Sequence, residues 1–219
     1  KVVGSYYNTP MIVRTANGAD PIRRVTIYAA SSGRIARPYF DAASALGGLL
    51  AETGVEIMYG GGRTGLMGAM ADAALAAGGR VHGVTPGFLR ELELSHETLT
   101  SLTVVNDMRE RKHLMLEQSD AVIALPGGCG TYEELFEALT LKRLGRWLGP
   151  IVLLNTGGFY QPLRAALDHA VSEGFMDQRH MGMWTLVAEP RGVIPALRTT
   201  PAWDQSSLEF ATAVGPAAS

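Results

Sequence analysis

The residues best suited to chemistry stand in a glycine-rich segment, PGGCGTYEE, at positions 126–134. Its glycines and Thr131 precede a predicted helix, and the free N–H groups and dipole of a helix start attract an anion. Glu133 and Glu134 follow, and such carboxylates can stabilise a cationic intermediate or activate a water molecule. The same residues also suit a structural role, as a capping box or as partners of the helix dipole. The segment therefore predicts an anion site with adjacent acids, or else a capped helix.

A second glycine-rich segment, GGGRTGLMG, occupies positions 60–68. Glycines let the chain turn tightly after a strand and let a ligand approach the backbone closely. The alternative is a strand-to-helix turn whose small residues serve only packing. The segment is not the phosphate loop of nucleoside triphosphatases, because no Lys-Ser or Lys-Thr pair follows the glycines. Two such segments in one chain favour ligand binding over packing.

A charged run, MRERKH, covers positions 108–113. Most runs of this kind are solvated faces of helices. This run directly follows a predicted strand, so Arg111 and Lys112 can present a guanidinium fork and an ammonium group to a phosphate or a developing anion.

Short apolar strands alternate with helices over most of the chain. We predict strands at 25–30, 55–59, 80–85, 102–105, 121–125, 151–154 and 184–187. We predict helices at 38–53, 66–77, 108–118, 131–144 and 160–173, and a mixed loop with some helix at 86–100. Such alternation gives a parallel sheet with helices on both faces, whose ligands bind at the carboxyl ends of the strands where strand order reverses. We therefore expect a single Rossmann-like, doubly wound α/β domain at 25–200, with an arm at 1–24 and a tail at 201–219.

The composition narrows the class of protein. With 47% hydrophobic and 18% charged residues, the chain is typical of a globular domain. Its net charge of −2 argues against a general nucleic-acid binder. No apolar run approaches the roughly 20 residues that span a bilayer, and a single cysteine excludes an internal disulfide and suits the cytoplasm. The five histidines lack the spacing of metal ligands, so we expect no metal site.

The three segments resemble the motifs of one enzyme family. Residues 126–134 fit the pattern PGGxGTxxE, residues 59–68 look like the family's first glycine loop, and residues 108–112 resemble its Arg-Lys motif. This is the lonely guy family, whose members cleave the N-glycosidic bond of cytokinin riboside 5′-monophosphates. The resemblance runs from about 25 to 187 and departs in the arm and at residues 29–32, AASS, where the family often has a Cys-Gly-Ser-Ser type.

The resemblance implies roles for individual residues. Arg111, Glu133 and Glu134 would be catalytic. The substrate- and phosphate-binding residues that it implies are Gly61, Gly62, Gly65, Met67, Glu93, Met108, Lys112, Pro126, Gly127, Gly128, Gly130, Thr131 and Thr140, with Asp107 as a weaker candidate. It further implies a nucleoside 5′-monophosphate substrate, no cofactor, and a homodimer or larger even oligomer with the site near the interface. Some relatives were long labelled lysine decarboxylases, but no lysine here stands in the context of a cofactor Schiff base.

The chemistry expected of these residues follows from charge. Cleavage of a ribose–base bond gives the sugar oxocarbenium character, which a nearby carboxylate stabilises. Glu133 or Glu134 can also orient or deprotonate water. Arg111 stabilises charge on the departing base, but its pKa is too high for it to donate a proton. The source of that proton stays open.

The thiol of Cys129 is a further reactive group in this segment. A thiol at a helix start can be acidified, but Cys129 fills the variable position of the motif, so we expect no catalytic role for it.

Two other functions remain as alternatives. A non-catalytic nucleotide or cofactor carrier on the same fold is one of them, although a binder of phosphate gains little from two nearby carboxylates. A pyrophosphatase or kinase-type phosphoryl enzyme is another, and the missing phosphate-loop lysine and metal-binding acids count against it.

Overall fold

The computed structural model describes residues 21–92, 95–201 and 203. Seven parallel strands form one sheet in the order β4-β3-β2-β1-β5-β6-β7. The strands are β1 (Arg24–Tyr28), β2 (Glu56–Tyr59), β3 (Val81–Pro86), β4 (Ser101–Val105), β5 (Ala121–Ala124), β6 (Ile151–Leu154) and β7 (Thr185–Val187). The predicted doubly wound α/β class is confirmed. Most of the predicted arm (1–20) and tail (202 and 204–219) lies outside the described residues.

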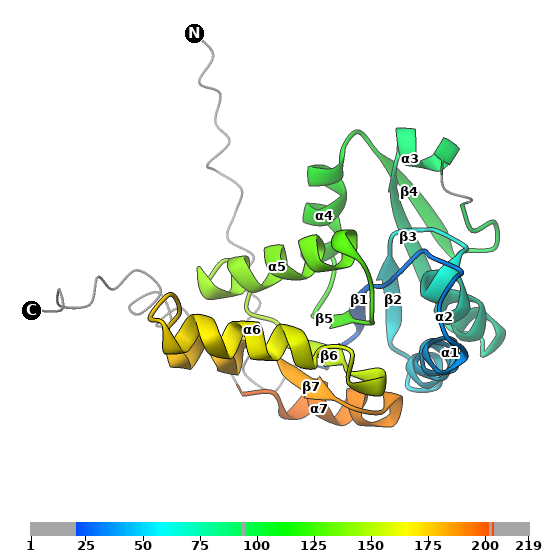
Figure 1. Cartoon of the computed structure of the whole chain (residues 1–219). Coiled ribbons are helices and arrows are strands. Elements are labelled where there is room, and N and C mark those ends of the chain that lie inside the picture. Colours follow the sequence, from blue (N-terminus) through cyan, green and yellow to red (C-terminus); the bar gives the residue numbers. More distant parts are fainter. Residues whose placement is uncertain (1–20, 93–94, 202, 204–219) are drawn as a thin grey trace, which may run out of the picture.

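Helices cover both faces of the sheet (Figure 1). They are α1 (Arg37–Glu52), α2 (Gly65–Ala76), α3 (Gly87–Leu92), α4 (Met108–Glu117), α5 (Cys129–Arg143), α6 (Gln161–Ser172) and α7 (Val193–Thr199). Successive strand residues point to opposite faces, so Val25 and Ile27 join the core under α1, α2 and α7. Tyr28 and Met58 join the other core, under α4, α5 and α6. Every strand residue of β5 and β6 is buried, as continuous apolar runs predict.

The strand order reverses beside β1. This central strand pairs with β2 on one side, where Val25 is opposite Ile57, and with β5 on the other, where Val25 is opposite Ala121. Connections leave β1 and β5 toward opposite faces, which opens a crevice beyond their carboxyl ends. The glycine segments at 60–68 and 126–131 begin at the carboxyl ends of β2 and β5, so the fold places both at this crevice.

Some local predictions were wrong. The helix expected from Thr131 begins at Cys129, with Gly128 as its N-cap. Thr131 is therefore inside the first turn, no acid lies in that turn, and the capping box does not form. The mixed loop at 86–100, where some helix was expected, does contain the helix α3, whereas α7 was not predicted. Among the described residues, no helix is both long enough and apolar enough to cross a membrane.

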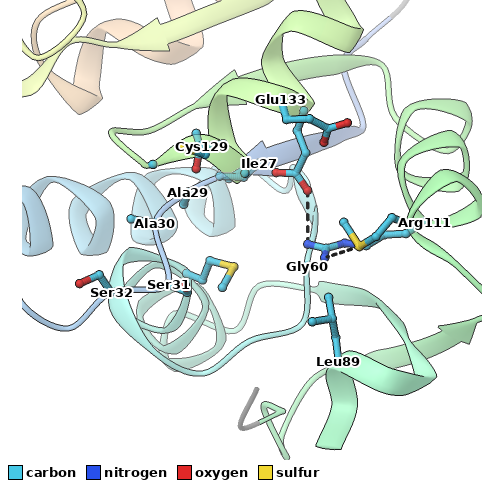
Figure 2. Close-up of a pocket in the computed structure, with 16 residues that line it drawn as sticks. Ile27, Ala29, Ala30, Ser31, Ser32, Gly60, Leu89, Arg111, Cys129 and Glu133 are labelled. Carbon is cyan, nitrogen blue, oxygen red and sulfur yellow. Dashed lines mark hydrogen bonds and ion pairs between the residues drawn. The ribbon is translucent and has the colours of Figure 1, made fainter. Parts of the chain in front are cut away.

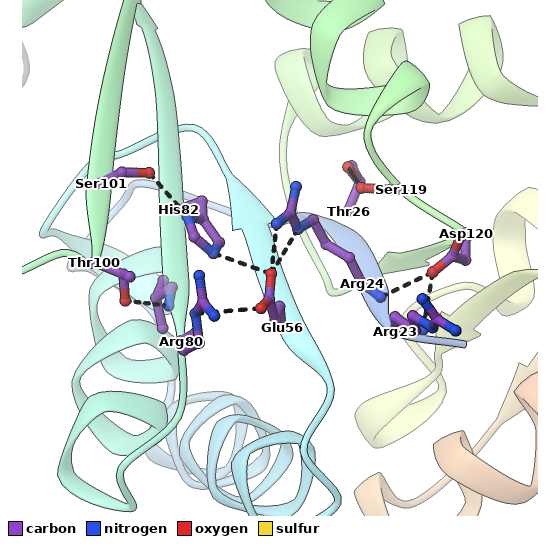
Figure 3. Close-up of polar contacts among 11 residues, drawn as sticks. Arg23, Arg24, Thr26, Glu56, Arg80, His82, Thr100, Ser101, Ser119 and Asp120 are labelled. Carbon is purple, nitrogen blue, oxygen red and sulfur yellow. Dashed lines mark hydrogen bonds and ion pairs between the residues drawn. The ribbon is translucent and has the colours of Figure 1, made fainter. Parts of the chain in front are cut away.

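An ion-pair network fixes the amino ends of the central strands (Figure 3). Glu56 Oε2 lies 2.5 Å from Arg24 Nη2 and 3.2 Å from His82 Nε2, and its Oε1 lies 3.2 Å from Arg80 Nε. Asp120 accepts the backbone N–H of Arg24 at 3.0 Å. The network therefore joins the starts of β1, β2, β3 and β5, at the end of the sheet opposite the glycine segments.

The substitution Glu56→Gln is expected to lower the free energy of unfolding by about 1 kcal/mol at neutral pH. Although burial would raise the pKa of Glu56, the hydrogen bond and charge of Arg24, with Arg80 and His82, hold it below its usual value. The stabilisation is thus complete above the usual glutamate pKa and is lost as the pH falls through the lowered one. Urea titrations at several pH values measure this, with exposed Glu52→Gln as the control. If the free energy of unfolding of Glu56→Gln differed from that of wild type by the same amount at pH 7 and at pH 3, the stabilising role of the Glu56 charge would be contradicted.

Candidate active site

A cavity of about 380 Å³ lies beyond the carboxyl ends of β1, β2 and β5 (Figure 2). The predicted site residues that line it are Met67, Met108, Arg111, Gly128, Gly130, Thr131, Glu133 and Glu134. They come from three stretches of sequence, and the topology brings them together. The predicted convergence of the two glycine segments and the charged run is therefore seen in the structure.

Eight further residues line the cavity without having been assigned a role from the sequence. They are Ile27, Ala29, Ala30, Ser31, Ser32, Gly60, Leu89 and Cys129. The stretch from Ala29 to Ser32 follows β1 directly, so its place beside the strand-order reversal was the signal that could have found it. Leu89 lies on α3, on the side of the cavity opposite Cys129 and Glu133 (Figure 2). No sequence signal marked it, because α3 fell within a segment of mixed pattern.

Gly65, Pro126 and Thr140 were predicted site residues but do not line the cavity. Gly65 has a φ of +63°, and a methyl group there would come within 2.5 Å of the Ala30 carbonyl oxygen. Pro126 is buried, and its carbonyl oxygen accepts the N–H of Ala30 at 3.3 Å. Thr140 is exposed on α5, roughly 13 Å along the helix from Thr131.

The first glycine segment and the segment after α3 also pair with each other. The Gly61 carbonyl oxygen accepts the N–H of His96 at 2.9 Å, and Gly62 forms a β-bridge with Ser95. Glu93 lies outside the described residues. Asp107, the weaker candidate, is the N-cap of α4, where its carboxylate accepts the N–H of Glu110 at 2.8 Å. These positions support the loops around the cavity.

Arg111 and Glu134 form an ion pair in the cavity wall. Arg111 Nη2 lies 3.3 Å from Glu134 Oε1, and the two side chains are only 9% and 10% exposed. A methyl group at Gly60 would come within 2.2 Å of Arg111 Nη2, so a larger residue would displace the guanidinium from this position. Arg111 Nη1 also contacts Met108 Sδ at 3.7 Å. The first glycine segment therefore turns the chain and also leaves space for the guanidinium of Arg111.

Lys112 points elsewhere. Its ammonium contacts Glu133 and lies 2.5 Å from Glu137 Oε2, between α4 and α5, and it does not line the cavity. Although burial alone would lower the pKa of Lys112, its contacts with Glu133 and Glu137 raise it. The lysine is therefore charged at neutral pH and bound to one of the predicted catalytic acids.

The second glycine segment presents backbone to the cavity. A methyl group at Gly127 would come within 2.0 Å of Thr131 Oγ1, so the loop folds tightly against the first turn of α5. Methyl groups at Gly128 and Gly130 would meet nothing within 4 Å, and both residues line the cavity. The open space thus lies beside the N-terminus of a 15-residue helix. This arrangement suits an anion such as a phosphate group.

The substitution Cys129→Ala is expected to leave kcat/KM within about threefold of wild type. Cys129 is exposed and lines the cavity, but it fills the variable position of the motif. A bulky thiol reagent should block the wild-type protein by occupying the cavity and should leave the alanine variant active. Steady-state kinetics before and after alkylation test this. A folded but inactive alanine variant would give the thiol a catalytic role.

Known proteins resemble the chain in sequence. Residues 67–197 match the family model described as "Possible lysine decarboxylase". The chain is 40% identical over 191 residues to the cytokinin riboside 5′-monophosphate phosphoribohydrolase of Rhodococcoides fascians, covering 87% of this chain and 96% of that one. It is 42% identical over 154 residues to an enzyme of that name from Arabidopsis thaliana, covering 70% and 72%.

Solved structures share the fold. The molybdenum cofactor carrier protein of Chlamydomonas reinhardtii superposes with a TM-score of 0.63 at 24% identity, covering 82% of this chain and 98% of that one. The molybdenum cofactor binding protein of Rippkaea orientalis gives a TM-score of 0.59, also at 24% identity, covering 80% and 94%. At this identity the likeness shows the architecture alone. The sequence matches show that the chain belongs to the lonely guy family, which includes the cytokinin riboside 5′-monophosphate phosphoribohydrolases of Rhodococcoides fascians and Arabidopsis thaliana.

Proposed function

We propose that the protein hydrolyses the N-glycosidic bond of cytokinin riboside 5′-monophosphates and releases the free base and ribose 5-phosphate. The observation that carries this proposal is the placement of Glu133 and the Arg111–Glu134 pair in the same cavity as the N-terminus of α5. The helix end suits the phosphate, and the acids suit the cationic sugar that forms beside it. Relatives at 40% and 42% identity bear the name of this activity.

The residues divide the work as follows. Backbone N–H groups from Gly128 to Thr131 hold the phosphate and fix the ribose against the acids. Glu133 or Glu134 stabilises the oxocarbenium-like sugar and orients the attacking water. Arg111, seated on Gly60, stabilises negative charge on the departing base. Among the described residues, no group of three or more histidine, cysteine, aspartate and glutamate side chains is arranged to hold a metal ion.

One assay tests the proposal. The protein is incubated with AMP and, separately, with isopentenyladenosine 5′-monophosphate, and free base and ribose 5-phosphate are quantified by chromatography. Release of both products in equal amounts supports hydrolysis. Tight nucleotide binding without either product would favour a non-catalytic carrier, and release of inorganic phosphate would favour a phosphoryl enzyme.

The cavity lacks the lysine that a decarboxylase with a Schiff-base cofactor would need, among the described residues. Neither of the two described lysines lines it. Lys112 is held by Glu133 and Glu137, and Lys142 is fully buried, where it donates to the Gly149 carbonyl oxygen at 2.8 Å. The description carried by the family model therefore does not extend to this site.

We infer a homodimer in solution, with its interface close to the site. Large apolar side chains are exposed at Phe88 on α3, Val104 on β4 and Phe136 on α5, at 52%, 48% and 41%. Burial of such groups between two copies is favourable, and two-fold dimers are the commonest oligomers. Sedimentation at micromolar protein is expected to show a dimer or a larger even assembly. A fully active monomer would contradict this inference.

A further inference from the structure

Lys112 links two glutamates that stand one helical turn apart. It follows Arg111 on α4, and its ammonium contacts both Glu133 and Glu137 on α5. The side chain of Lys112 is 13% exposed, and that of Glu137 is 32% exposed. Glu133 lines the cavity, whereas Lys112 and Glu137 do not. Of these three residues, Glu133 is therefore the one through which Lys112 and Glu137 can affect the cavity.

The charges around this contact do not cancel. Arg111 and Lys112 face three carboxylates, those of Glu133, Glu134 and Glu137. Burial, together with the charges of Glu134 and Glu137, raises the pKa of Tyr28 on β1, so its hydroxyl stays neutral. One ammonium shared by two carboxylates neutralises neither completely. Glu133 therefore retains part of its negative charge at the cavity wall, which favours a cationic sugar.

We propose that Lys112 and Glu137 are positioning residues: Lys112 fixes the Glu133 carboxylate at the edge of the cavity, and Glu137 shares the same ammonium and so limits how fully Lys112 neutralises Glu133. This inference rests on the proposed hydrolysis. Without Lys112, two like charges at i and i+4 would repel, and one would take up a proton at a higher pH. Without the charge of Glu137, Lys112 would neutralise Glu133 more fully and make it a weaker base. Lys112 thus sets the position of Glu133, and Glu137 limits how strongly Lys112 binds it.

The experiment compares kcat at saturating isopentenyladenosine 5′-monophosphate across pH for Glu137→Gln, Lys112→Met and Glu137→Asp. We use kcat because the substrate phosphate itself ionises near pH 6 and kcat reports groups in the bound complex. In Glu137→Gln the acid limb of the kcat profile should move to lower pH by about half to one pH unit, and the plateau value of kcat should fall about three- to tenfold. In Lys112→Met the acid limb should move to higher pH by a similar amount. Glu137→Asp, which keeps the charge, should restore the wild-type limb.

Glu117→Gln, at the far end of α4, is the matched control and should leave the profile unchanged. A merely structural role for Glu137 would lower activity without moving the acid limb, and unmoved limbs in both variants would overturn the inference. Carbon-13 titration of the Glu133 carboxyl, assigned with Glu133→Gln, reads the same opposite shifts without substrate. Absence of base release by the wild-type protein would thus refute the proposed function, while the titration still decides the coupling. If Lys112→Met does not fold, Glu137→Gln alone must show the downward shift.

Discussion

Replacement of Glu134 by glutamine is expected to lower kcat for base release by roughly a hundredfold or more. The amide keeps the size of the side chain but removes the negative charge that would stabilise a cationic sugar. Glu133→Gln is expected to lower kcat as well, because its carboxylate lines the same cavity. AMP should still bind to at least one of these variants, since the helix end that suits the phosphate is unchanged. Single-turnover kinetics and calorimetric binding of AMP measure the two effects separately.

Stability must be followed in the same variants. The Glu134 side chain is only 10% exposed beside Arg111, and removal of one partner of a buried ion pair can cost on the order of 3 kcal/mol. The melting temperature of Glu134→Gln should therefore be measured first. Its kinetics are then compared with those of the control Glu117→Gln at a temperature where both variants are folded. Near-wild-type turnover in folded Glu133→Gln and Glu134→Gln would remove the proposed mechanism.

The second large effect concerns the phosphate. We expect kcat/KM for adenosine to be about a hundredfold or more below that for AMP, because two or three charge-assisted hydrogen bonds of about 1.5–3 kcal/mol each are lost. The bonds would come from the backbone of Gly128 to Thr131 at the N-terminus of α5. Since phosphate binding also positions the ribose against the acids, its loss should lower kcat as well as raise KM.

The comparison extends to longer phosphate chains and to prenylated bases. ADP and ATP should be poor substrates, because Arg111 is the one cationic side chain among the described residues that line the cavity, and it is already paired with Glu134. Kinetics with adenosine, AMP, ADP, ATP, and the isopentenyl forms of the first two provide the measurement. Equal rates on a nucleoside and its monophosphate would refute phosphate binding at residues 126–131.

The architecture and the main site segments could be predicted because each depends on a local signal. Alternating apolar runs identified all seven strands, and a glycine segment that follows a strand marks the carboxyl edge of a parallel sheet. Arg111 was found because the charged run directly follows a strand and resembles the Arg-Lys motif of the family. The close approach of the Arg111 guanidinium to Gly60 was not predicted, because this approach depends on how α4 packs beside the loop after β2.

The residues that sequence reasoning missed depend on tertiary placement. Leu89 has no polar chemistry, and only the position of α3 brings it to the cavity. The contact between Lys112 and Glu137 requires α4 and α5 to approach at that turn, which no pattern within either helix specifies. The type of Thr131 suits either an N-cap or a phosphate-binding hydroxyl, but the helix begins two residues earlier, with Gly128 as its N-cap, so the first alternative is wrong.

The central place of β1 has a consequence for biosynthesis. Its partner β5 lies about a hundred positions later in the chain, so a ribosome completes β1 to β4 while one side of β1 has no neighbour. Until β5 emerges, that apolar strand is an open edge, and such edges are sites of aggregation and chaperone binding. Nascent chains that end before residue 121 should therefore be the species most dependent on chaperones. They should also be unable to retain nucleotide, since the phosphate loop has not yet been made.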